Sequence, residues 1–113
     1  LFTWPSPMFG GMFGACHAVE LGFVFGTLGD PGMADFSGSG PAADALSAHT
    51  MDAWLAFARS GDPSTASLGR WPTYSPVDRA TMLLGARSTL EKAPLEDERS
   101  AWSAVPKSIL GAL

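Results

Sequence analysis

One histidine, His17, stands in a setting that suits proton transfer. Histidine accepts and returns a proton near neutral pH, and the carboxylate of Glu20 follows three residues later, ahead of an apolar run over residues 21–25. Residues 1–4 predict a short strand that leads into the loop carrying His17. Loops just beyond strand ends are where α/β sheets usually hold their chemistry. A lone histidine beside apolar residues is more often a packed or surface residue, so residue type alone leaves both interpretations open.

Four motifs in order along the chain carry a resemblance to a known family. They are Gly14-x-x-His17-x-x-Glu20-Leu21-x-Phe23-Val24-Phe25-Gly26, Trp54-x-x-Phe57-Ala58-Arg59-Ser60-Gly61-Asp62-Pro63, Trp71-Pro72-x-Tyr74, and the segment from Trp102 to Leu110 with its internal Pro106. In these positions the sequence resembles the type-B carboxylesterase and cholinesterase family, of the α/β-hydrolase fold. The resemblance covers nearly the whole chain, and its motifs are stronger together than any is alone.

The resemblance implies a catalytic triad of serine, acidic residue and histidine, with His17 as the histidine. A nucleophilic serine of this fold needs a Gly-x-Ser-x-Gly turn between a strand and a helix, and the triad order is serine, acid, histidine. No serine of the chain has glycine at both the −2 and the +2 position. We therefore expect the serine and the acid to lie upstream. Residues 1–113 are then the C-terminal portion of a single carboxylesterase domain, without an internal domain boundary.

Four further residues are candidates for the site. In the resembling family the triad acid comes from a separate upstream loop, so Glu20 is expected to hydrogen-bond near the site instead; if the segment is helical, it shares a face with His17. The loop before the histidine helps to line the active-site gorge of the family, which makes Phe9, Met12 and Phe13 candidate substrate-pocket residues. Packing against an absent sheet is an equally good interpretation of these three side chains.

Composition excludes several classes of function. The net charge is −4 and the seven Lys and Arg residues are scattered, so no basic stripe suggests a nucleic-acid partner. The single cysteine, Cys16, forms no disulfide framework and has no metal-ligand spacing, so we expect a small buried hydrophobe, no metal and no cofactor. No apolar run reaches the ~18 residues that a membrane span needs. The compartment, cytoplasmic or secreted, stays open.

The remaining pattern predicts an α/β fold: the last strands, the histidine loop, one long helix and a C-terminal helix. We expect the long helix over residues 41–59, a short strand over 80–84 within a mostly irregular stretch, and a second helix from Leu95, which Pro106 kinks or ends. The predicted covered face of the long helix comprises Leu46, Thr50, Met51, Ala53, Trp54, Phe57 and Ala58, and its solvated face His49, Asp52 and Arg59. The predicted docking stripe of the last helix comprises Trp102, Val105, Ile109 and Leu110.

These observations predict hydrolysis of a small-molecule carboxylic ester by a longer enzyme, to which this chain contributes the histidine. The predicted partner is the missing N-terminal part of that enzyme, and the chain alone is expected to be inactive. Only 16% of the residues are charged and 46% are hydrophobic, which favours surfaces that pack against something else. Two alternatives remain: a cholinesterase-like adhesion domain that has lost catalysis, and a small free-standing binding protein.

Overall fold

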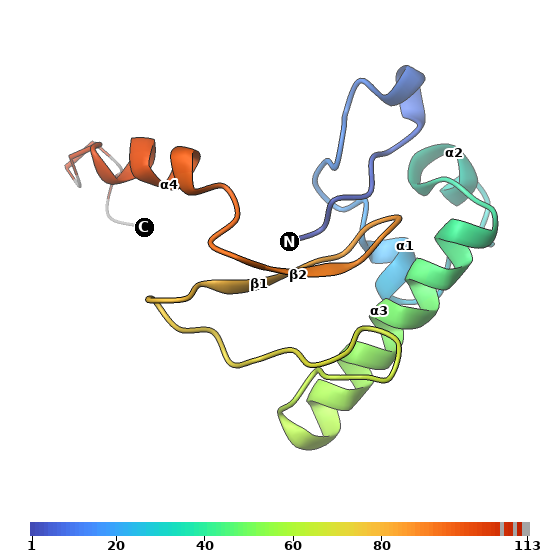
Figure 1. The fold of residues 1–113 in the computed structure, drawn as a ribbon. Coiled ribbons are helices and arrows are strands. Elements are labelled where there is room, and N and C mark those ends of the chain that lie inside the picture. The colour runs from blue at the N-terminus through green and yellow to red at the C-terminus, as the bar shows by residue number, and fades with distance from the viewer. Residues whose placement is uncertain (107, 110, 112–113) are drawn as a thin grey trace.

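Figure 1 shows the computed structural model, which describes residues 1–106, 108–109 and 111. Short helical turns alternate with loops before one long helix, and a hairpin and a last helix follow. The elements in chain order are η1 (Met8–Gly11), α1 (Leu21–Val24), α2 (Met33–Ser37), α3 (Pro41–Ser60), β1 (Ala80–Leu83), β2 (Thr89–Lys92) and α4 (Glu96–Ser103).

The strands form a two-stranded antiparallel sheet, and the first residues of the chain pair with the segment just after β1. On one side β1 pairs with β2 in antiparallel register, from Ala80 opposite Lys92 to Leu83 opposite Thr89. On the other side the first residues run parallel to the end of β1: Phe2 bridges to Leu84, and the N–H of Thr3 donates to the Leu84 carbonyl (2.7 Å). The strand predicted at 80–84 is confirmed to within one residue, since β1 ends at Leu83. The sequence did not predict β2, whose four residues are all exposed and show no apolar alternation.

Local sequence explains both ends of α3. Pro41 occupies the first turn, where its missing N–H is not needed, and Gly61 ends the helix in a left-handed conformation (φ 76°), with its N–H donating to the Phe57 carbonyl (2.7 Å). The predicted bounds are confirmed to within one residue. The buried face consists of small and medium side chains, namely Ala43, Leu46, Ser47, Thr50 and Ala53.

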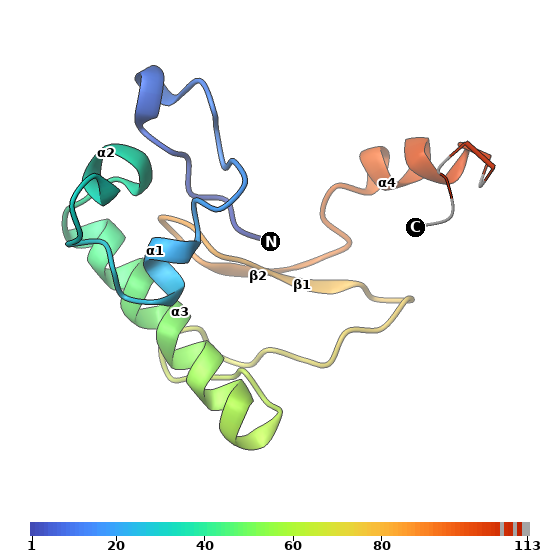
Figure 2. The ribbon, with the colours of Figure 1, turned by 180° about the vertical axis from the view of Figure 1, so that it is seen from behind.

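The predicted orientation of α3 was partly wrong. Trp54 and Phe57 are 59% and 56% exposed, although the helical pattern placed both on the covered face. His49 is half-buried, although the pattern placed it in solvent. The reason is that α3 packs against α1 through its buried residues between Ala43 and Ala53, and Ala43 and Leu46 also join the core cluster that contains Met82. The last turns of α3 extend past these contacts, as Figures 1 and 2 show from opposite sides.

The hydrophobic core lies between α1, α3 and the sheet. Its central side chain is Phe23, which is fully buried and contacts the rings of Phe2 and Trp4 at centroid distances of 5.2 and 5.5 Å. The other buried members of this cluster are Ala43, Leu46, Met82 and Leu84. The core therefore ties the segment before His17, the helix after it and the sheet into one unit.

The molecule is open for its size. Its radius of gyration is 16.0 Å, whereas a compact domain of this length has about 13 Å. Its accessible surface is 7684 Å², whereas a compact monomer of the same mass exposes about 5,900 Å². Figure 2 shows α4 projecting away from α1, α2 and α3. Much apolar surface is left uncovered.

The last helix, α4, ends before the position predicted for its break. It spans Glu96–Ser103, so Val105 and Ile109 lie beyond it and do not continue a helical stripe with Trp102. Trp102 and Ile109 are exposed, and Leu110 lies outside the described residues. Pro106 follows the helix end, in agreement with its lack of a backbone N–H. Among the described residues, no helix is long and apolar enough to cross a membrane.

Candidate active site

His17 is exposed on a turn directly before α1. Backbone hydrogen bonds close the loop that carries it: the N–H groups of Ser6 and Cys16 both donate to the Gly14 carbonyl (2.9 and 3.0 Å). After His17, Ala18 has a left-handed backbone (φ 68°), and the N–H of Val19 donates to the Cys16 carbonyl (3.3 Å). The imidazole is therefore accessible while the backbone on both sides of it is anchored.

Glu20 lies at the start of α1, where its carbonyl accepts the N–H groups of Phe23 and Val24 (3.0 and 2.9 Å). Its side chain is half-buried. The helical geometry that would align Glu20 with His17 is not formed, because the helix begins only at Leu21 and Ala18 is left-handed. Within the described part of the chain, neither side chain donates or accepts a hydrogen bond.

The three candidate pocket residues lie together around η1. The rings of Phe9 and Phe13 meet edge to face at a centroid distance of 5.3 Å, and Met12 lies between them in the chain. All three side chains are exposed. Two successive left-handed residues, Phe9 (φ 52°) and Gly10 (φ 67°), turn the backbone here. This apolar cluster of Phe9, Met12 and Phe13 lines neither of the two cavities described below.

Sequence reasoning missed the buried polar side chains that hold the histidine loop. Ser37 on α2 is fully buried, and its hydroxyl donates to the Val19 carbonyl (3.3 Å). Ser6, also fully buried, donates to the Phe36 carbonyl (2.6 Å), and the indole N–H of Trp4 donates to the Ser37 carbonyl (2.8 Å). The Gly and Ser residues at positions 37–40 are typical of a flexible loop, so the sequence did not predict α2. No local pattern indicates that a serine is buried.

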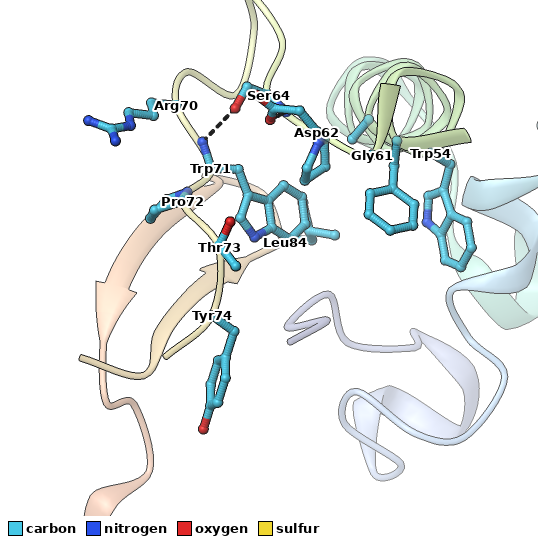
Figure 3. Close-up of a pocket in the computed structure, with 13 residues that line it drawn as sticks. Trp54, Gly61, Asp62, Ser64, Arg70, Trp71, Pro72, Thr73, Tyr74 and Leu84 are labelled. Atoms are coloured by element: carbon cyan, nitrogen blue, oxygen red, sulfur yellow. Dashed lines mark hydrogen bonds between the residues drawn. The ribbon is translucent and has the colours of Figure 1, made fainter. Parts of the chain in front are cut away.

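An open groove of about 650 Å³, the larger of two cavities described here, lies elsewhere (Figure 3). None of its lining residues precedes Ala53, so it contains neither His17 nor any other candidate. Trp71 lies on one side of the groove, and its backbone N–H donates to the Ser64 hydroxyl (2.9 Å). Hydrogen bonds from Ser64 lower the pKa of the Asp62 carboxyl. The groove offers aromatic surface but no histidine or cysteine, so it lacks the side chains that the proposed acyl-transfer chemistry needs from this chain.

Other chemistry finds little support in the described residues. No three His, Cys, Asp or Glu side chains lie close enough in that part of the chain to hold a metal ion. Cys16 is a free thiol and is half-buried, not fully buried as predicted. A second cavity of about 310 Å³ is lined by His49 together with Arg87 and the serines Ser67 and Ser88.

Comparison with known proteins decides the family. The sequence profile of the carboxylesterase family matches residues 2–102. This chain belongs to the carboxylesterase family. It is 35% identical over 85 residues to para-nitrobenzyl esterase of Bacillus subtilis (strain 168), covering 75% of this chain and 17% of that protein. It is 35% identical over 86 residues to phenmedipham hydrolase of Pseudarthrobacter oxydans, covering 74% of this chain and 17% of that protein.

A solved structure agrees with this assignment. The fold matches carboxylesterase EST55 of Geobacillus stearothermophilus with a TM-score of 0.74 and 40% sequence identity, over 89% of this chain and 20% of that structure. The chain thus spans about a fifth of the length of the relatives it matches. The resemblance inferred from the four motifs is confirmed. All three relatives are named as hydrolases or esterases, which does not favour the adhesion alternative.

Proposed function

We propose that this chain supplies the triad histidine, His17, to a longer carboxylesterase that hydrolyses carboxylic esters. Membership of the carboxylesterase family over residues 2–102 supports the reaction class. The observation that carries the role of His17 is its position. It is exposed on an anchored loop that follows the sheet-paired segment at Phe2, and it directly precedes α1. Loops beyond strand ends are where catalytic groups of α/β sheets gather.

The proposed chemistry is acyl transfer in two steps. The His17 imidazole takes the proton of the serine hydroxyl as the serine attacks the ester carbonyl, and it then returns that proton to the leaving alcohol. In the second step the imidazole takes a proton from a water molecule that attacks the acyl carbonyl, and it returns that proton to the serine oxygen as the bond to serine breaks and the acid leaves. An exposed ring on a fixed backbone suits this role, because the serine and the acid must approach it from the rest of the enzyme.

We further propose that residues 1–113 form the C-terminal portion of one esterase domain. The accessible surface exceeds that of a compact monomer of equal mass by about 1,800 Å². An excess of this size on one partner is about twice the ~800 Å² that each side of a standard protein interface buries. It supports packing against the part of the enzyme that corresponds to the other four fifths of the relatives.

The remaining candidate residues receive roles around His17. The apolar cluster of Phe9, Met12 and Phe13 would line the substrate pocket, since all three side chains are exposed on the loop that leads to His17. Glu20 would hydrogen-bond near the site and is not the triad acid. Its half-buried side chain at the start of α1 leaves it close to His17 in the chain.

The test uses the full-length enzyme that carries this chain, with a para-nitrobenzyl ester as substrate. His17→Ala should lower kcat on the order of 10⁶-fold, the loss seen when a serine-hydrolase triad loses its histidine. His49→Ala is the matched control, because His49 is the other histidine and lies within α3. It should leave kcat within about twofold, as expected for a residue outside the reaction. Comparable losses in both variants, or turnover retained in His17→Ala, would contradict the proposal.

A further inference from the structure

We propose that Ser37 is a positioning residue for His17 and acts through the backbone of the turn that carries it. This inference rests on the proposed function, because it concerns the geometry of the same histidine. Ser37 lies 20 residues after His17 in the sequence. It ends α2, and its side chain reaches back to the loop.

The contact is made in a place from which water is excluded. Ser37 is 0% exposed, and Val19, whose carbonyl accepts its hydroxyl, is 1% exposed. A buried carbonyl without a hydrogen-bond donor raises the free energy of the folded state. The Ser37 hydroxyl supplies that donor, so the Val19 carbonyl can be buried in the turn. Val19 is two residues from His17, so a bond that fixes its carbonyl also restrains the backbone of the turn that carries His17.

The backbone between these two residues needs such support. Ala18 has φ 68°, a conformation that residues other than glycine adopt at a cost and keep only where the surroundings hold them. The N–H of Leu21 donates to the Ala18 carbonyl (3.2 Å), which fixes one side of the turn. The Ser37 hydroxyl fixes the next carbonyl along. Together these bonds set the direction in which His17 leaves the backbone.

The same short helix also holds the other limb of the loop. The indole N–H of Trp4 donates to the Ser37 carbonyl (2.8 Å), and the Ser6 hydroxyl donates to the neighbouring Phe36 carbonyl (2.6 Å). The end of α2 therefore clamps both the entry to the histidine loop and its exit at Val19. Figure 1 shows α2 beside the loop, at the end of the molecule away from α4.

Loss of the Ser37 hydroxyl should affect catalysis more than binding. The turn at Ala18 would relax, and the imidazole would move relative to a serine held by another part of the enzyme. A misplacement of about 1 Å can cost on the order of 100-fold in rate. Ester binding would change little, because the Ser37 side chain is fully buried and not accessible to a ligand.

The test compares three serine-to-alanine variants of the full-length esterase. Ser47 is the matched control: it is 5% exposed and its hydroxyl donates to the Phe23 carbonyl (2.9 Å), so it makes the same kind of bond away from the turn. Ser39 is exposed and its side chain makes no hydrogen bond among the described residues, so it measures the background. The readouts are kcat, KM, Tm and the amplitude of the acyl-enzyme burst, which counts competent sites.

Ser37→Ala should lower kcat per competent site about 10- to 100-fold with KM within about twofold. Ser47→Ala should lower Tm similarly and leave kcat per site unchanged, and Ser39→Ala should change neither. Equal kcat in the Ser37→Ala and Ser47→Ala enzymes would overturn the inference. Failure of the proposed function gives a different result, namely turnover retained in His17→Ala.

A second variant covers the case in which Ser37→Ala does not fold. Trp4→Phe keeps an aromatic ring in the core but removes the N–H that donates to the Ser37 carbonyl. It should cause the same selective loss of kcat per competent site. An unchanged kcat in Trp4→Phe would show that the clamp does not position His17.

Discussion

Phe23 joins the histidine loop to the core, and its removal is the sharpest stability test that the structure offers. The side chain is fully buried, contacts the rings of Phe2 and Trp4, and belongs to a helix that begins four residues after His17. Phe23→Ala deletes the ring while leaving the backbone carbonyl that Ser47 binds. The change therefore tests packing and not the hydrogen bond.

The expected cost can be worked from these contacts. Truncation of a buried phenylalanine to alanine costs about 3–5 kcal/mol, through lost burial and the cavity that remains. Each aromatic pair adds about 0.5–1.5 kcal/mol beyond the buried area. With two such pairs, we expect the upper half of the range, about 4–5 kcal/mol. A loss of this size approaches the entire stability of many domains.

The assay is denaturant unfolding of the full-length enzyme, followed by tryptophan fluorescence. Asp52→Ala is the control: its charged side chain is exposed on α3, outside the buried face of that helix, and is not apolar surface that the rest of the enzyme would cover. It should cost at least about 2 kcal/mol less than Phe23→Ala, because exposed sites lose little on truncation. A Phe23→Ala cost below about 1 kcal/mol, or equal costs at both positions, would refute this account of the core.

Three further predictions concern the frame around the site. Gly85→Ala places a Cβ against the Thr3 hydroxyl, which its hydrogen bond to the Leu84 carbonyl holds in place, and should cost about 1–3 kcal/mol by overpacking. Gly29→Ala, which has open space, should change the urea midpoint little, and equal midpoints would contradict the packing described. The hydrogen bond from Arg99, with the charge of Arg79, holds the pKa of Glu96 below its usual 4.5. The ion pair of Glu96 with Arg99 therefore stabilises the fold above pH 4.5, and this stabilisation is lost as the pH falls through the lowered pKa. The difference in Tm between wild type and Glu96→Gln should shrink on acidification below pH 4.5. A constant difference would contradict this prediction. The 113-residue chain alone should show no sharp calorimetric transition, because so much apolar surface is uncovered, whereas a sharp one would favour a free-standing protein.

Features with local causes were predictable from the sequence. The ends of α3 follow from Pro41 and Gly61, which act through their own backbone geometry, and both were placed to within one residue. The strand at 80–84 follows from an apolar run that ends at a glycine. The family followed from four motifs whose order, more than any single residue, is specific.

Features that depend on distant partners were not predictable in the same way. The helical pattern of α3 could not show that Trp54 and Phe57 extend past the packed face, because exposure depends on what lies opposite. The exposed strand β2 has no burial signal of its own and forms by pairing with β1. Ser37 was missed because a serine shows its role only when the carbonyl it binds, 18 residues away, is known.

The position of His17 in the complete enzyme tests the central claim most directly. The measurement is the distance from the His17 imidazole to the nearest serine hydroxyl in a crystal structure of the full-length esterase. The account predicts a serine Oγ at about 2.6–3.2 Å from one ring nitrogen, or slightly further without substrate, and a carboxylate on the other. An imidazole with no serine hydroxyl within reach, or a serine paired with a different histidine, would contradict it.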